Sequence, residues 1–169
     1  GINYCKISTF DVPLRDRSKN SKDFSQLYSE LYSLVYDIAG EESSLSDYRL
    51  MATNYPEMAL HINKRIQEFF KLVDSLFEGT GKTISINRKN NRLIFTDDDE
   101  IIELHQLSSG EKQLLLVLLK VFLMDEAPYI LLMDEPEISL HIEWQHRLFD
   151  VIRKLNPNTQ IITSTHSPS

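Results

Sequence analysis

Hydrophobic residues recur at helical spacing in two segments of the first half of the chain. Between residues 24 and 38 their pattern predicts an amphipathic helix that stops before Gly40. A Ser- and Glu-rich linker is expected over residues 41–47, followed by a short helix over 48–55 and a longer one from Glu57. The apolar positions of the two long helices are Phe24, Leu27, Leu31, Leu34, Val35 and Ile38, then Leu60, Ile62, Ile66, Phe69, Phe70, Val73, Leu76 and Phe77.

Strand patterns dominate the second half. Alternation over residues 83–87 and 92–96 predicts a β-hairpin, with a third strand over 101–104. The apolar runs over 129–134 and 160–164 lack alternation, which is typical of buried strands in a mainly parallel sheet. We therefore expect an α/β fold with a mainly parallel sheet flanked by helices, an antiparallel hairpin at its edge and a helical arm. Residues 1–78 would form an N-terminal loop and the arm, and residues 79–169 the α/β lobe.

Composition narrows the classes of function. The 169 residues carry 18 Lys and Arg against 25 Asp and Glu, and a net charge of −7 disfavours a stand-alone nonspecific nucleic-acid binder. DNA contact by a local basic stripe stays possible. Its best candidate is the hairpin, with Lys82, Arg88, Lys89 and Arg92, but a solvated turn is the favoured interpretation because so few charges bind DNA weakly. Cys5 is the only cysteine, so no internal disulfide is expected and a reducing cytoplasm fits. The longest apolar stretch, residues 114–124, contains Lys120 and is shorter than the ~20 residues that span a bilayer. We expect a core helix there and no membrane partner.

The first chemical motif is the string LSSGEKQ at residues 107–113. It predicts a helix start capped by Ser108 or Ser109, and small residues beside free N–H groups favour anion binding there. An ordinary capped helix is the alternative.

The second motif is YILLMDEP at residues 129–136, an apolar strand that ends in two carboxylates and a proline. Open α/β sheets bind ligands at the carboxyl ends of their strands. Asp134 is therefore expected to hold Mg²⁺, largely through water. Glu135 is expected to be the general base that activates a water molecule against a terminal phosphate.

The third motif is a short strand over residues 160–164 that leads into hydroxyl side chains and His166. A histidine at a strand end can hydrogen-bond a phosphate or the attacking water. A structural role is the commoner one for a single histidine, and its position after the carboxylate strand favours the functional role.

Together the three motifs resemble the signature motif, the Walker B motif with its D-loop, and the H-loop of ABC-type ATPases. The string DEPEISLH at 134–141 is most similar to soluble RecF-, SMC- and OLD-related ATPases, and to AAA ATPases of bacterial anti-phage systems such as PtuA. The family usually has glycine where this chain has Ser109, and relatives often have proline where it has Ile142. The resemblance implies ATP and Mg²⁺ as cofactors and assigns ATP-binding roles to Ser108, Ser109, Gly110, Glu111 and, in the D-loop, Ser139, with Asp134 as the Mg²⁺ ligand and Glu135 and His166 as catalytic residues.

A glycine-rich string at residues 79–83, GTGKT, looks like part of a P-loop but fails two tests. Leu76 stands where the pattern requires glycine, and the string follows a helix and opens a strand, the reverse of a P-loop. The chain therefore lacks a Walker A lobe, which we expect elsewhere in the same gene product. On its own the chain is expected to be inactive.

Two hypotheses of function follow. The first is an ATPase that works as a head-to-tail dimer, in DNA repair or anti-phage defence, with a nuclease or other effector as a further partner. The second is a nonhydrolysing nucleotide-sensing or dimerisation module that docks a nuclease or DNA. A transporter subunit is disfavoured by the D-loop string and by the lack of a membrane segment.

Overall fold

The computed structural model describes residues 3–8, 26–38, 42–90, 92–134 and 142–164. The chain forms two compact units, residues 1–30 with 108–169 (unit 1) and residues 31–107 (unit 2). None of the described helices is long and apolar enough to cross a membrane.

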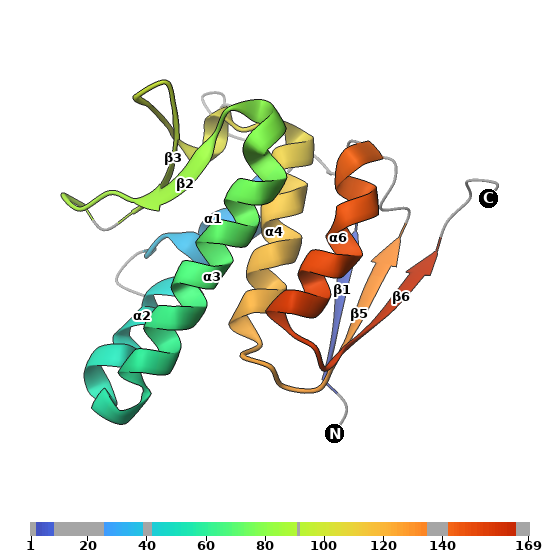
Figure 1. Cartoon of the computed structure of the whole chain (residues 1–169), viewed down its shortest axis with the longest axis horizontal. Helices are drawn as coiled ribbons and strands as arrows, with labels where there is room; N and C mark the ends of the chain where they lie inside the picture. The colour runs from blue at the N-terminus through green and yellow to red at the C-terminus, as the bar shows by residue number, and fades with distance from the viewer. Residues whose placement is uncertain (1–2, 9–25, 39–41, 91, 135–141, 165–169) are drawn as a thin grey trace, which may run out of the picture. The chain divides into compact units, whose positions relative to one another are not determined.

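Unit 1 is built on a parallel sheet of three strands in the order β1-β5-β6 (Figure 1). These strands are β1 (Tyr4–Ser8), β5 (Tyr129–Asp134) and β6 (Thr159–Ser164). Both pairings of β5 are parallel, so all three carboxyl ends lie at one edge of the sheet. The two apolar runs predicted as parallel strands are confirmed.

Two helices complete unit 1. Nearly every residue of α4 (Ser109–Leu123) from Leu114 to Phe122 is buried, as predicted for a core helix. α6 (Ile142–Leu155) is amphipathic and contacts α4. It buries Leu148, Val151, Ile152 and Leu155, the spacing of one helix face. In Figure 1, α6 lies in front of the upper part of β1.

The amino ends of β5 and β6 are joined by two asparagines. Asn156 is fully buried; its Nδ2 donates to the Ala127 carbonyl at 2.9 Å, and its Oδ1 accepts from the Asn158 N–H at 3.0 Å. Asn158 Nδ2 donates to the Glu126 carbonyl at 2.7 Å. Asp125 and Glu126 have φ of 46° and 64°, so these bonds hold a left-handed turn between α4 and β5.

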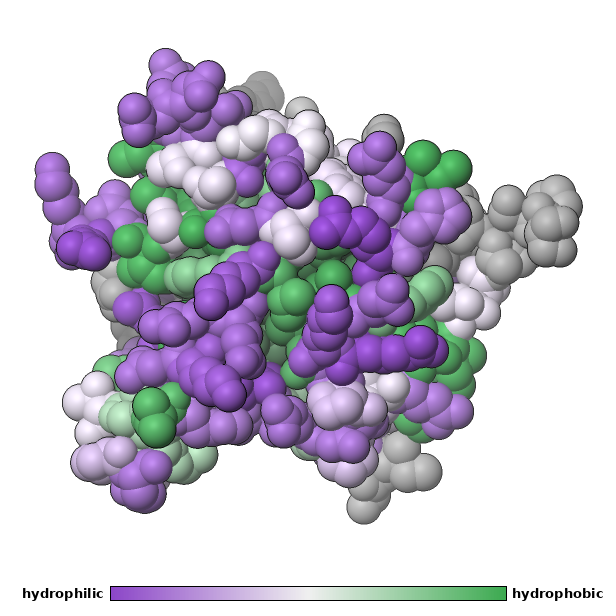
Figure 2. Space-filling view, viewed as in Figure 1, coloured by the Kyte–Doolittle hydropathy of each residue, from purple (hydrophilic) through white to green (hydrophobic). Residues whose placement is uncertain are grey.

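Unit 2 contains α2 (Ser44–Asn54), the short helix η1 (Pro56–Met58) and α3 (Ala59–Phe77). The helix predicted over 48–55 begins earlier, within the segment predicted as linker. Its start is fixed by Ser43, whose Oγ accepts from the Ser46 N–H at 3.2 Å while its own N–H donates to Asp37 at 2.8 Å. Polar side chains cover the outer face of α3 (Figure 2). Leu60, in the first turn of α3, is 83% exposed.

The first helix of the chain, α1 (Gln26–Val35), confirms the predicted helix over 24–38 and carries Tyr28 and Tyr32. Tyr36, just beyond its end, donates from its hydroxyl to the Leu93 carbonyl at 2.9 Å, and the Tyr32 ring packs edge-on against it at 4.7 Å. In unit 1, Lys120 pairs with Glu30 and the Lys112 ammonium lies 5.7 Å from the Tyr28 ring centre. These tyrosines therefore pack against neighbouring residues of the protein.

The predicted hairpin is present, but it belongs to a sheet of its own. β2 (Thr83–Ile86), β3 (Leu93–Asp97) and β4 (Glu100–Ile102) form an antiparallel sheet in unit 2. The expectation that this hairpin lies at the edge of the parallel sheet is therefore wrong. Its strands pair only with each other, and Phe95 stacks on Phe77 of α3 at 5.0 Å. The predicted boundary between residues 78 and 79 falls inside this unit.

Gly81 makes the turn from α3 into β2. This agrees with the prediction that the string GTGKT follows a helix and opens a strand and is not a P-loop. The short helix η2 (Glu78–Thr80) precedes it, and Gly81 has φ of 74°, a conformation that glycine adopts at little cost. A Cβ atom there would lie 3.1 Å from Asp97 Oδ1. The string GTGKT is therefore a helix-to-strand turn, and Lys82 lies at the opposite end of the hairpin from Arg88 and Lys89.

Asp74 fastens α3 to this hairpin. Its carboxylate accepts from the Ile84 N–H at 2.7 Å, and burial raises its pKa above the ordinary value of 3.8, an effect that the hydrogen bond partly offsets. Because the folded state holds the Asp74 proton more tightly than the unfolded state does, this group lowers stability as the pH rises through the window just above 3.8.

Replacing Asn156 by alanine is expected to destabilise the protein by about 1–3 kcal/mol, because the Ala127 carbonyl and the Asn158 N–H lose a buried partner. Denaturant unfolding monitored by circular dichroism measures the effect. Asn158→Ala, at an exposed site, should cost about 1 kcal/mol or less. Equal stability of Asn156→Ala and the parent would contradict the structural role of this side chain.

Asp74→Asn should retain the acceptor for the Ile84 N–H and remove the pH effect. We expect the stability of this variant, relative to the parent, to increase as the pH rises above 3.8, and to equal or exceed that of the parent at pH 7. Unfolding curves between pH 4 and 7 provide the measurement. Asp74→Leu, which removes the acceptor, should be less stable than the parent at every pH. A constant difference between the Asn variant and the parent would show that burial of Asp74 does not affect its titration.

Candidate functional site

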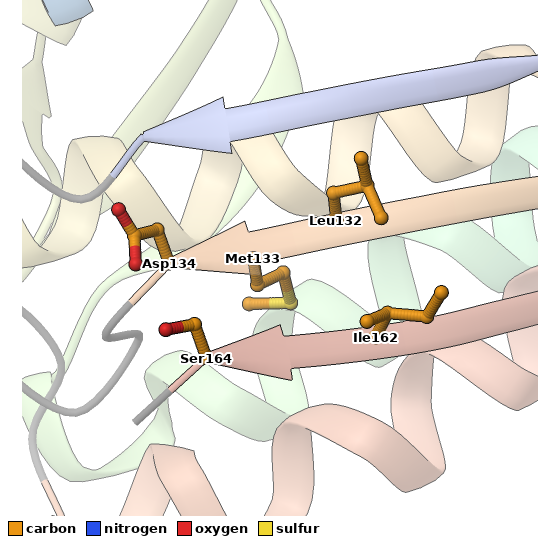
Figure 3. A pocket seen from close by; sticks show the side chains of 5 residues that line it. All are labelled: Leu132, Met133, Asp134, Ile162 and Ser164. Atoms are coloured by element: carbon orange, nitrogen blue, oxygen red, sulfur yellow. The ribbon is translucent and has the colours of Figure 1, made fainter. Parts of the chain in front are cut away.

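The carboxyl edge of the parallel sheet brings oxygen-bearing residues of three strands into one row. Asp134, the last residue of β5, pairs in register with Ser8 of β1 on one side and Ser164 of β6 on the other. In Figure 3 the Asp134 carboxylate and the Ser164 hydroxyl both stand at the arrowheads of their strands. The edge thus presents a carboxylate at the end of a parallel strand, as the sequence predicts, and the structure adds that this strand is the middle one of the three described.

A hollow of about 330 Å³ lies beside this edge, lined among the described residues by Leu132, Met133, Asp134, Ile162 and Ser164. Figure 3 shows Leu132 and Ile162 along the two strands that lead to it, with helices behind the sheet.

The opposite faces of the parallel sheet differ in burial. Leu131 and Met133 are buried, whereas Leu132, one position along, is half-buried. Ile162 and Tyr4 lie on the same face of the sheet as Leu132. Ile162 is 47% exposed and Tyr4 is 71% exposed. Parallel sheets are normally covered on both faces. Within the part of the chain that the structure describes, this sheet is covered on one face only.

The donor set at Asp134 suits a hard cation that keeps much of its water. No group of three or more His, Cys, Asp and Glu side chains able to hold a metal occurs among the described residues. Mg²⁺ commonly binds through one or two carboxylates together with water and substrate phosphates. A half-buried carboxylate at a strand end is a donor of that kind, and the role of Asp134 as a Mg²⁺ ligand stays a prediction.

The predicted anion site lies at the start of α4. Ser108 is the N-cap, with φ of −62° and ψ of 163°, and its Oγ accepts from the Glu111 N–H at 3.2 Å. Glu111 Oε2 in turn accepts from the Ser108 N–H at 2.7 Å. These reciprocal bonds form a capping box. The sequence predicted a serine cap, and the structure assigns it to Ser108 rather than Ser109.

The cap leaves part of the first turn available. It occupies the N–H of Glu111, and the N–H of Lys112 donates to the Ser108 carbonyl at 2.9 Å. The N–H groups of Ser109 and Gly110 have no acceptor within an α-helix. Ser108 and Ser109 are exposed, so this turn lies at the surface of unit 1.

The described residues include only some of the predicted site residues. Glu135, Ser139 and His166 lie outside the described residues, so their roles stay predictions. None of the residues described as lining the hollow at Asp134 comes from the Ser108 turn.

Sequence reasoning did not single out Ser8 and Ser164 as site residues. Ser8 precedes Asp134 by more than a hundred positions, and only the pairing of β1 with β5 places it next to the carboxylate. Ser164 is part of the third motif, in which His166 is the residue predicted to be functional.

Two relatives each match a part of this chain. An uncharacterised protein of Dictyostelium discoideum is 42% identical over 86 residues, which cover 47% of this chain and 11% of that protein. An uncharacterised ABC transporter ATP-binding protein of Haemophilus influenzae is 42% identical over 65 residues, covering 38% of this chain and 24% of its own length. The chain therefore matches about a tenth and about a quarter of these two relatives.

A solved structure also shows similarity, the SmcHead bound to the C-winged helix domain of ScpA. It is 20% identical in sequence, with a TM-score of 0.49, over 70% of this chain and 39% of that one.

A family model matches residues 9–169, nearly the whole chain. Its description reads "AAA domain, putative AbiEii toxin, Type IV TA system". Because the match covers the α4 start and the Asp134 strand together, the chain belongs to this AAA domain family.

Proposed function

We propose that this chain is the carboxyl-terminal lobe of an ABC-type ATPase that binds and hydrolyses ATP with Mg²⁺. The observation that carries the proposal is the position of Asp134, a carboxylate at the carboxyl end of the middle strand of a parallel sheet. That is where α/β sheets bind ligands. Membership of the AAA domain family supports the same function.

In the proposed site each residue has a separate task. Asp134 would hold Mg²⁺, which supplies charge neutralisation at the phosphates when bound. Glu135 would accept a proton from the attacking water, and His166 would hydrogen-bond the water or the terminal phosphate. Ser139 would contact nucleotide from the D-loop.

We further propose that two copies meet head to tail. The Ser108 turn is exposed and does not line the hollow at Asp134, so one copy's turn would reach the phosphate held by the other. The N–H groups of Ser109 and Gly110 are donors of the kind that bind phosphate.

A Walker A lobe elsewhere in the gene product is part of the proposal. The uncovered sheet face, with Tyr4 and Ile162 exposed, supports it, since a parallel sheet is normally covered on both faces. DNA repair or anti-phage defence is the proposed process, with a nuclease or other effector as partner.

Asp134→Asn in the full-length gene product is expected to lower ATP turnover at least 10-fold at limiting Mg²⁺ and to raise the Mg²⁺ concentration needed for half-maximal turnover, because an amide binds Mg²⁺ less well than a carboxylate. Phosphate release measured across a Mg²⁺ titration gives both quantities. Asp150→Asn, on the exposed face of α6, is the matched control and should behave like the parent. An unchanged Mg²⁺ dependence for Asp134→Asn would remove Asp134 from the metal site.

Glu135→Gln in the same protein should reduce phosphate release about 100-fold or more, the usual contribution of a general base, while ATP-dependent dimers persist. Light scattering with and without ATP measures the dimers. Glu143→Gln, at the exposed start of α6, serves as the control. Turnover equal to that of the parent would exclude Glu135 as the base.

The same measurements decide between this proposal and its alternative. A parent protein that binds ATP and dimerises without releasing phosphate would be a nonhydrolysing nucleotide-sensing module that docks a nuclease or DNA.

A further inference from the structure

The carboxylate of Glu111 is turned away from the surface on which a phosphate would bind. Glu111 is 5% exposed, and its Oε2 lies 2.7 Å from the Ser108 nitrogen, on the backbone that enters α4. Ser108 and Ser109, by contrast, are exposed. The acidic residue of the motif therefore contacts the protein's own backbone.

A second argument comes from charge. A phosphate that touched Glu111 would meet another anion, and two like charges at contact distance repel each other strongly where water is excluded. The groups suited to a phosphate are the N–H groups of Ser109 and Gly110 and the Ser108 O–H. The Ser108 oxygen accepts from the Glu111 N–H, and a hydroxyl that accepts through a lone pair can still donate its proton.

We propose that Glu111 is a positioning residue of the nucleotide site: it fixes the Ser108 backbone so that the Ser108 O–H and the N–H groups of Ser109 and Gly110 point outward to the phosphate held by the second subunit. This inference rests on the proposed function and assigns Glu111 a role other than direct phosphate contact. Both bonds of the capping box are needed, since each fixes one end of the turn that carries the donors.

The charge of Glu111 and its hydrogen bond have opposite effects on anion binding. The hydrogen bond orders the donors, whereas the negative charge offsets the partial positive charge at the start of α4. Glutamine keeps an oxygen that can accept from the Ser108 N–H and loses the charge. The two amino-acid changes Glu111→Gln and Glu111→Ala therefore separate a positioning role from a direct electrostatic one.

The test uses the full-length gene product and follows ATP turnover as a function of protein concentration. Head-to-tail pairing makes turnover depend on dimer formation, so the concentration at half-maximal turnover reports how well the Ser108 turn engages its partner. For Glu111→Ala we expect this concentration to rise about 10-fold, corresponding to about 1.4 kcal/mol, with turnover at saturating protein within about twofold of the parent, because the effect is on binding. Glu111→Gln should restore most of the parent's behaviour.

The matched control is Ser43→Ala. Ser43 caps α2 through the same kind of bond, with Oγ accepting from the Ser46 N–H at 3.2 Å, but belongs to the other unit. Its loss should lower stability to a degree similar to that of Glu111→Ala and leave the concentration at half-maximal turnover unchanged. A shift in this control as large as that of Glu111→Ala would reduce Glu111 to an ordinary helix cap and overturn the proposal.

Two other outcomes would also overturn it. If Glu111→Gln fails as completely as Glu111→Ala, an acceptor for the Ser108 N–H is not enough to restore function, and the positioning role is overturned. If Glu111→Ala matches the parent, the residue has no positioning role, while the proposed ATPase function stands. Should Glu111→Ala not fold, Glu111→Asp, whose carboxylate is one methylene shorter, replaces it with the same expected direction. Absence of turnover in the parent itself would overturn the proposed function, and this inference with it.

Discussion

The parallel pairing of β5 with both of its neighbours is the constraint on which unit 1 depends. Because β1, β5 and β6 run in the same direction, their last residues share one edge of the sheet. Backbone pairing alone therefore places Asp134 between Ser8 and Ser164. The helices α4 and α6 bury the apolar residues of this unit, such as Leu131 and Ile152, so the position of the edge is maintained by the hydrophobic core. The asparagine pair at the other end of the strands satisfies the backbone groups of a turn that would otherwise be costly.

Much of the fold could be predicted from local pattern. Apolar runs without alternation identified β5 and β6, and the helical spacing of Leu148, Val151 and Ile152 is that of an amphipathic helix whose buried face the structure shows. The serine cap of α4 and the turn at Gly81 were also predictable, because capping and left-handed glycine depend on neighbouring residues.

What local pattern could not supply was long-range pairing. The position of Ser8 beside Asp134 and the independence of the β2–β3–β4 sheet both depend on contacts between distant segments. The early start of α2 had a different cause: Ser43 resembles a linker residue until its bonds to Ser46 and Asp37 are known. At the candidate site, sequence named the chemistry at Asp134 and Ser108 but gave Glu111 the same role as its neighbours. Only burial and the direction of its carboxylate distinguish it.

β6 is an edge strand of the described sheet, and its sequence, TQIITS, has no proline and no charge. Unpaired edges of this composition are templates for pairing with other chains, and β6 carries no gatekeeper residue against it. The segment therefore makes this chain prone to self-association whenever nothing covers that edge. In a cell, such a lobe would depend on prompt docking of covering segments during synthesis, and delayed docking would favour aggregation over folding.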